Sequence, residues 1–166
     1  MNDRAAATHG ESVHREGEHA GSPYKQLVLM ALVHLPLMYA VMFTMVYSWS
    51  EVVHNLNTFY MAGMMVAPMI ILMPIMMKSM YPNRRANLLV YASSVALFAV
   101  LFSFLRNQAF VGDAQFLKSM IPHHSGAILM CEEAKLSNPE LKVLCSDIIK
   151  AQKAEIAQMK ELLSRM

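Results

Sequence analysis

The chain has 166 residues, of which 55% are hydrophobic and only 16% are charged, with a mean hydropathy of +0.33. This balance excludes an ordinary soluble domain, because such domains carry about 25% charged residues, and it indicates a membrane protein. The net charge of +2 is too small to indicate a nucleic-acid-binding surface. Two cysteines are too few for a disulfide framework.

The first segment, residues 1–24, is rich in Gly, Ser, Glu and His and has no apolar period. Such a segment buries too little surface to offset its ordering entropy, so we predict a disordered cytoplasmic tail. Its composition does not resemble a cleavable signal peptide. Its regularly spaced His9, His14 and His19 fit a solvated tail or, alternatively, a weak metal-collecting tail.

Three apolar segments follow, from Lys25 to about Tyr47, from Leu56 to about Met77 and from Arg85 to about Leu105. Each has close to the ~20 residues that a helix needs to cross the hydrocarbon core of a bilayer. The sequence therefore predicts a three-helix transmembrane domain over residues 25–106.

The distribution of Lys and Arg predicts the orientation of these helices. The loop between the second and third segments carries Lys78, Arg84 and Arg85, whereas residues 48–55 carry neither Lys nor Arg. By the positive-inside rule, the N-terminus and the basic loop are cytoplasmic. Everything after residue 105 is then periplasmic or extracellular, and the expected location is the inner membrane of a bacterium.

From residue 113 the composition becomes globular, and residues 113–166 read as an antiparallel helical hairpin. Asp113 is the expected N-cap of a first helix that ends at Lys135, and Asn138 followed by Pro139 predicts the start of a second. The fold class is all-α: three transmembrane helices followed by an extracytoplasmic hairpin. About 50 residues are marginal alone, so we expect packing on the membrane domain or a four-helix-bundle-like homo-oligomer.

The first hairpin helix carries two imidazoles and two thioethers within about three turns, at Met120, His123, His124 and Met130. Neutral nitrogen with soft sulfur is the ligand set that selects copper(I) over magnesium, calcium or manganese. We therefore predict a copper(I) site here, with Met159 of the second helix as a further ligand. His124 is expected on the seam between the helices. His123 is expected beside the seam, because adjacent residues on a helix point about 100° apart.

The second hairpin helix has an apolar seam with a period of about 3.5 residues, formed by Leu141, Cys145, Ile148, Gln152, Glu155, Met159 and Leu162. Gln152 and Glu155 are its polar members, and antiparallel folding brings His124 level with Gln152. Buried polar groups are costly unless they are paired or bound. We expect both side chains to hydrogen-bond the N–H group of a metal-binding imidazole, which fixes its tautomer, without binding the metal themselves.

Cys131 and Cys145 each lie seven residues from Asn138, so the same folding brings them level. They are expected either to form a disulfide or to add soft ligands to the site.

The hairpin sequence resembles the domain-of-unknown-function 305 family over the last third of the chain. The matching residues are Phe116, Leu117, Met120, Ile121, Pro122, His123, His124, Ala127, Met130, Pro139, Glu140, Leu141, Ile148, Ile149, Gln152, Glu155, Ile156 and Met159. The resemblance implies a small, copper-associated helical domain, usually exported, with a role in copper tolerance or periplasmic copper handling. The membrane part is similar to membrane-anchored members. Cys131 and Cys145 depart from the pattern, where small apolar residues are expected.

The favoured function is a membrane-anchored periplasmic protein that binds copper(I), with the copper ion, the lipid bilayer and further copies of the chain as partners. An enzyme is not expected, because the hairpin lacks the Glu-x-x-His repeats of di-iron bundles. Two alternatives stay open. One is a structural hairpin without metal affinity.

The other alternative is a copper-conducting transporter. Methionines recur four residues apart in the second span, at Met61, Met65, Met69 and Met73. The first span has the same spacing with one histidine, at Met30, His34, Met38 and Met42. This Met-x-x-x-Met pattern is similar to the eukaryotic three-helix copper transporters. The predicted orientation is the reverse of theirs, and the third span lacks their G-x-x-x-G packing motif.

Overall fold

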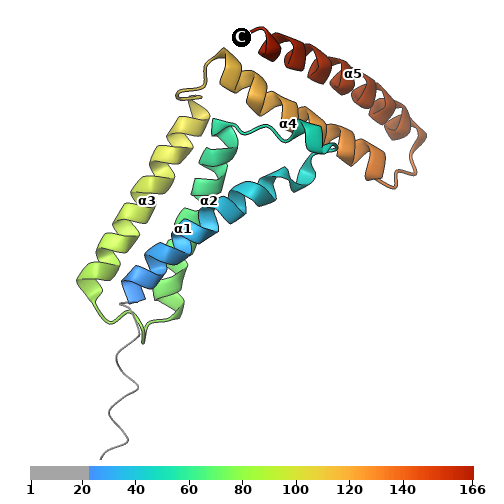
Figure 1. Cartoon of the computed structure of the whole chain (residues 1–166). Coiled ribbons are helices and arrows are strands. Elements are labelled where there is room, and N and C mark those ends of the chain that lie inside the picture. Colours follow the sequence, from blue (N-terminus) through green and yellow to red (C-terminus); the bar gives the residue numbers. More distant parts are fainter. Residues whose placement is uncertain (1–22) are drawn as a thin grey trace, which may run out of the picture.

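The computed structural model describes residues 23–166, in which every regular element is helical (Figure 1). The elements are α1 (Pro23–Val41), η1 (Met42–Met45), η2 (Trp49–Glu51), α2 (Leu56–Met76), α3 (Arg84–Arg106), α4 (Asp113–Glu133) and α5 (Pro139–Ser164). The predicted all-α fold is confirmed. The expected tail of residues 1–24 lies, up to residue 22, outside the described residues.

Three helical segments are long and apolar enough to cross a membrane: Pro23–Met45, Leu56–Met76 and Arg84–Arg106. α2 lies between α1 and α3 and packs against both. Small residues allow this packing, because a Cβ atom on Gly63 would lie only 2.5 Å from Cδ1 of Leu101 on α3. The α-helical part of the first segment ends at Val41, earlier than expected, where the Thr44 hydroxyl donates to the Val41 carbonyl (2.8 Å) and the chain tightens into η1.

The position at which a helix begins depends on the residues that can cap its first turn. Asn138 accepts a hydrogen bond from the Glu140 amide (2.8 Å) and Pro139 opens α5, as predicted. At the start of α4 the prediction was wrong, because Gly112 is the N-cap and Asp113 is the first helical residue. There its carboxylate lies near the positive end of the helix dipole. α4 ends at Glu133, two residues before the expected end.

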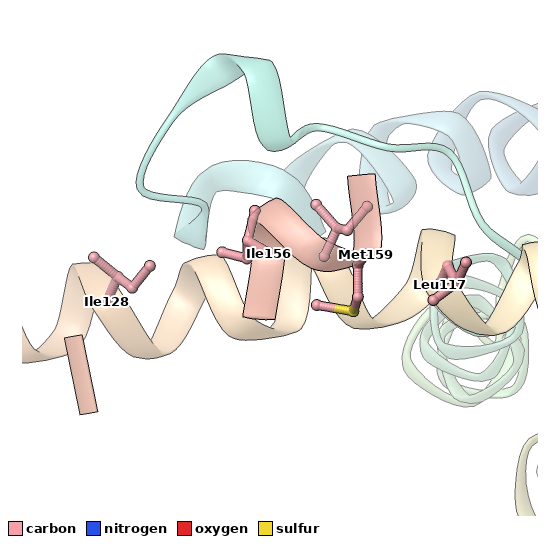
Figure 2. Packing of buried hydrophobic residues seen from close by; sticks show 5 residues of the cluster. Leu117, Ile128, Ile156 and Met159 are labelled. Atoms are coloured by element: carbon pink, nitrogen blue, oxygen red, sulfur yellow. The ribbon is translucent and has the colours of Figure 1, made fainter. Parts of the chain in front are cut away.

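The hairpin has its own apolar core between α4 and α5, formed by Leu117, Ile121, Ile128, Ile156 and Met159. Figure 2 shows Ile156 and Met159 of α5 lying over α4, between Ile128 and Leu117. Side chains of α5 thus fit between side chains of α4, as expected for two antiparallel helices packed against each other.

The seam of α5 is rotated relative to the prediction. Ile156, rather than Glu155, is the buried residue, and Ile149, rather than Ile148, packs against the core. A straight α-helix has 3.6 residues per turn, so a seam drawn with a 3.5-residue period drifts by about 20° per heptad. Over the 26 residues of α5 this drift adds up to about 70°, most of the roughly 100° that separates neighbouring residues.

The hairpin lies across the ends of the spanning helices, with α4 between α5 and the segment that joins α1 to α2 (Figure 1). That segment packs Val53 against the hairpin core. On the other side, the turn between α3 and α4 is held by the Tyr60 hydroxyl, which donates to the Ala109 carbonyl (2.8 Å). The hairpin therefore packs on the membrane part, which was one of the two expectations for it.

Candidate metal centre

α4 presents the four expected ligands on two different faces. His124 is partly buried and contacts α5, and Met120, one turn earlier, packs against the hairpin core. His123 and Met130 are seven residues apart, share an outer face and are exposed, with Met130 at 56%. The structure thus places His124 on the seam, as expected, and separates His123 and Met130 from it.

Both ring nitrogens of His124 have oxygen partners. Nδ1 lies 2.9 Å from the Met120 carbonyl oxygen of its own helix, and Nε2 lies 2.8 Å from a Glu155 carboxylate oxygen on α5. Because a carbonyl oxygen only accepts, Nδ1 must carry a proton. Nε2 is then the nitrogen that holds a proton toward Glu155 or a lone pair toward a metal ion.

This arrangement is the one found in metal sites, where a ligating histidine donates its other N–H to a carbonyl or carboxylate. The Glu155 side chain is half-exposed (51%), so it can turn toward solvent when an ion takes its place on Nε2. The sequence predicted Gln152 at the level of His124. The structure gives this contact to Glu155, three residues further along α5.

Two thioethers lie in the same part of the hairpin as His124. Met159 is 9% exposed and belongs to the core, one turn after Glu155 on α5. Met120 packs against the same core and supplies the carbonyl that fixes His124. One imidazole nitrogen and two thioether sulfurs are donor atoms of the kind that suits copper(I).

Among residues 23–166, no three side chains of the His, Cys, Asp and Glu types converge as a metal site. The set around His124 differs in kind, because methionine supplies two of its three donor atoms. Donor atoms of this kind prefer a monovalent soft ion.

Cys131 and Cys145 are joined by a disulfide near the turn of the hairpin, with their Cα atoms 5.2 Å apart. The expected proximity is confirmed. Because both sulfurs are bonded to each other, they are not available as thiolate ligands in this state.

One element of the site was not anticipated from the sequence. Ser125, next to His124, is fully buried, and its hydroxyl donates a hydrogen bond to Glu51 of η2. The same oxygen accepts from the Tyr47 amide (2.7 Å), and the second carboxylate oxygen of Glu51 lies 3.7 Å from Lys160 of α5. Glu51 thus joins both hairpin helices to the membrane part.

A second polar cluster lies close to the disulfide. Lys153 of α5 forms an ion pair with Glu132 of α4 (3.0 Å), and its ammonium group lies 5.1 Å from the centre of the Tyr47 ring. The hydrogen bond from Lys153 lowers the pKa of Glu132, and the same bond raises the pKa of Lys153.

Comparison with known proteins places the hairpin in one family. The family described as "Domain of unknown function (DUF305)" matches residues 99–163, from the end of α3 to the end of α5. An uncharacterized protein of Acanthamoeba polyphaga mimivirus is 37% identical over 111 residues, which cover 66% of this chain and 71% of the viral protein. No solved structure matches the chain.

Proposed function

Because this chain belongs to the DUF305 family and joins the family's domain to three helices able to cross a membrane, we propose that it is a membrane-anchored copper(I)-binding protein. Its role is copper handling or copper tolerance. The ion binds in the hairpin to Nε2 of His124 and to the sulfurs of Met120 and Met159. Glu155 gives way to the ion, and His123 and Met130 lie outside this set.

The observation that carries the proposal is the hydrogen bond between Nδ1 of His124 and the Met120 carbonyl. It fixes the tautomer before metal arrives and leaves Nε2 directed across the seam, next to a core that includes Met159 and against which Met120 packs. The ordered imidazole thus lowers the entropic cost of binding an ion.

The hairpin is proposed to lie outside the cytoplasm. The loop between α2 and α3 is basic, whereas the segment between α1 and α2 carries no Lys or Arg. The disulfide also supports a hairpin outside the cytoplasm, because disulfides persist in oxidising compartments. In a bacterial cell this corresponds to the inner membrane, with the N-terminus in the cytoplasm and the hairpin in the periplasm.

The location is tested with alkaline phosphatase fused to the chain at two points. Fusion after Met166 should give active enzyme, because the phosphatase folds only outside the cytoplasm. Fusion after Met80, between α2 and α3, should give inactive enzyme and is the matched control. The reverse pattern would refute the orientation.

Copper binding is tested by titrating the full chain in lipid nanodiscs with copper(I) against a chromophoric chelator. His124→Ala and Met120→Leu should each weaken binding at least tenfold without loss of helicity by circular dichroism. His54→Asn, which replaces an exposed histidine outside the hairpin, is the control and should bind like the parent. If the double variant His123→Ala/His124→Ala binds as tightly as the parent, the proposed site is wrong.

The competing structural role gives a different result in the same titration. A hairpin that serves only as a membrane-anchored interaction module shows no copper(I) affinity in the parent or in any variant.

A further inference from the structure

Apart from tyrosines, His34 is the one ionisable side chain that lies in the interior of α1, α2 or α3, since the Lys and Arg residues of these helices are near their ends. It follows the first residue of α1 by eleven positions, which is about 16 Å along a helix. That depth is near the middle of a hydrocarbon core about 30 Å thick. Ionisable residues at that depth are costly and mark binding sites or ion pathways.

The surroundings of His34 are soft and apolar. A groove of about 320 Å³ on α1 is lined by His34, Met30 and Gln26 together with Leu29, Val33 and Leu37. Met30 precedes His34 by four residues and Met38 follows it by four, so the three side chains share one face of the helix. All three are partly buried.

The pair Met30 and His34 repeats the spacing of Met120 and His124 in the hairpin. α2 packs against α1, but the groove around Met30 and His34 is lined by residues of α1 alone. Nitrogen and sulfur donors therefore lie four residues apart on one helix in the membrane, as they do in the hairpin.

We propose that Met30 and His34 form a second copper(I) site inside the membrane, with Met38 as the next thioether on the same face of α1. The inference rests on the proposed function, because the hairpin is the source of the ion. A neutral imidazole and thioethers bind a monovalent soft ion without introducing a second buried charge. The chain then holds two copper(I) ions at different depths.

The position of η1 connects the two sites. η1 packs against α4, and the Met45 carbonyl oxygen lies close to Gly126, where an added Cβ atom would be 3.4 Å away. Met45 and Met42 therefore continue the line of sulfurs from Met38 to the hairpin. Copper(I) that leaves the hairpin has methionine ligands along the way to His34.

The test counts copper(I) ions in the full chain in nanodiscs, by competition with bicinchoninate. His9, His14 and His19 are replaced by Asn in every variant, so that the tail does not contribute. The parent should bind two ions and the His123→Ala/His124→Ala variant one. Adding Met30→Leu and His34→Leu to that variant should abolish binding.

The matched control is Met76→Leu in the hairpin-deficient background, which makes the same change at an 80% exposed position at the end of α2. It should still bind one ion. Replacing His34 by Leu removes a polar group from an apolar groove, so the variant should keep the elution volume and unfolding temperature of the parent. X-ray absorption of the hairpin-deficient variant should show nitrogen and sulfur ligands.

Each outcome separates the two proposals. If the hairpin-deficient variant binds no copper(I), the membrane site is refuted while the hairpin site stands. If parent and hairpin-deficient variant both bind one ion that is lost with His34, the membrane site is supported and the hairpin site is refuted. If the ion survives in the Met30→Leu/His34→Leu variant, the membrane site is wrong.

Discussion

Ser125 of α4 and Glu51 of η2 are 74 residues apart in the sequence, yet the buried Ser125 hydroxyl donates a hydrogen bond to the Glu51 carboxylate. The same hydroxyl accepts a hydrogen bond from the Tyr47 amide. One small side chain thus fixes two positions of the segment between α1 and α2. The hairpin and the membrane part are joined by a partly buried polar contact.

Ser125→Ala is expected to destabilise this junction. The substitution leaves the Tyr47 amide without its acceptor, and an unsatisfied buried polar group costs about 1–3 kcal/mol. Thermal unfolding should begin at a lower temperature, and hydrogen exchange should increase in residues 46–53. Ser146→Ala on the exposed face of α5 is the control. Unchanged exchange in the variant would show that the contact is not stabilising.

Met159→Leu should separate the role of this residue in the core from its role as a ligand. Leu and Met have similar volumes, so the exchange should cost less than about 1.5 kcal/mol of stability. The copper(I) affinity should fall about tenfold, which corresponds to about 1.4 kcal/mol. Met130→Leu, at an exposed position, should leave the affinity unchanged. A larger loss with Met130→Leu would place the site on the outer face of α4.

The ion pair of Glu132 and Lys153 predicts a pH dependence of hairpin stability. The lowered pKa of Glu132 means that its contribution is present above its ordinary pKa of 4.5 and is lost as the pH falls further. The raised pKa of Lys153 means that its contribution is lost as the pH rises above 10.5. The hairpin should therefore be most stable between these limits.

This effect should be small, because both groups are solvent-exposed, and salt should reduce it. The measurement is the unfolding temperature between pH 3 and pH 7 at low and high salt. Lys153→Met should flatten the acid part of the profile by removing the partner of Glu132. An identical profile in parent and variant would contradict the prediction.

Replacing Cys131 and Cys145 by Ser should destabilise the hairpin without unfolding the spanning helices. The disulfide joins residues 14 positions apart, and a loop of that size constrains the unfolded chain by about 3 kcal/mol. Reductant should lower the unfolding temperature of the parent and leave the double variant unchanged. A parent insensitive to reductant after export would show that the disulfide does not form.

Much of the hairpin could be predicted because its determinants are local. Asn138 and Pro139 set the start of α5, and the equal distances of Cys131 and Cys145 from that turn brought them together. The placement of His124 on the seam followed from its level in the folded hairpin, although the partner expected there was Gln152 and the observed one is Glu155. These features depend on neighbours in the chain, so the sequence pattern contains them.

The remaining features depend on contacts between distant segments. Glu155, rather than Gln152, meets His124, because the register of two packed helices depends on the turn and on the contacts of the whole hairpin. No pattern marks Glu51 as the partner of Ser125, since the two lie in separate elements whose packing is decided by the whole fold. Periodicity predicts which face of a helix is buried, but not which loop covers it.

The hairpin is attached to the spanning helices at two places, through the turn after α3 and through the segment before α2. A domain on a single linker can move through a large volume, whereas two attachments hold the hairpin in one position. An ion bound at the proposed hairpin site would therefore be held at one height relative to α1, α2 and α3. A partner that exchanged this ion would have to approach from the solvent side of α5, the helix farthest from those three (Figure 1).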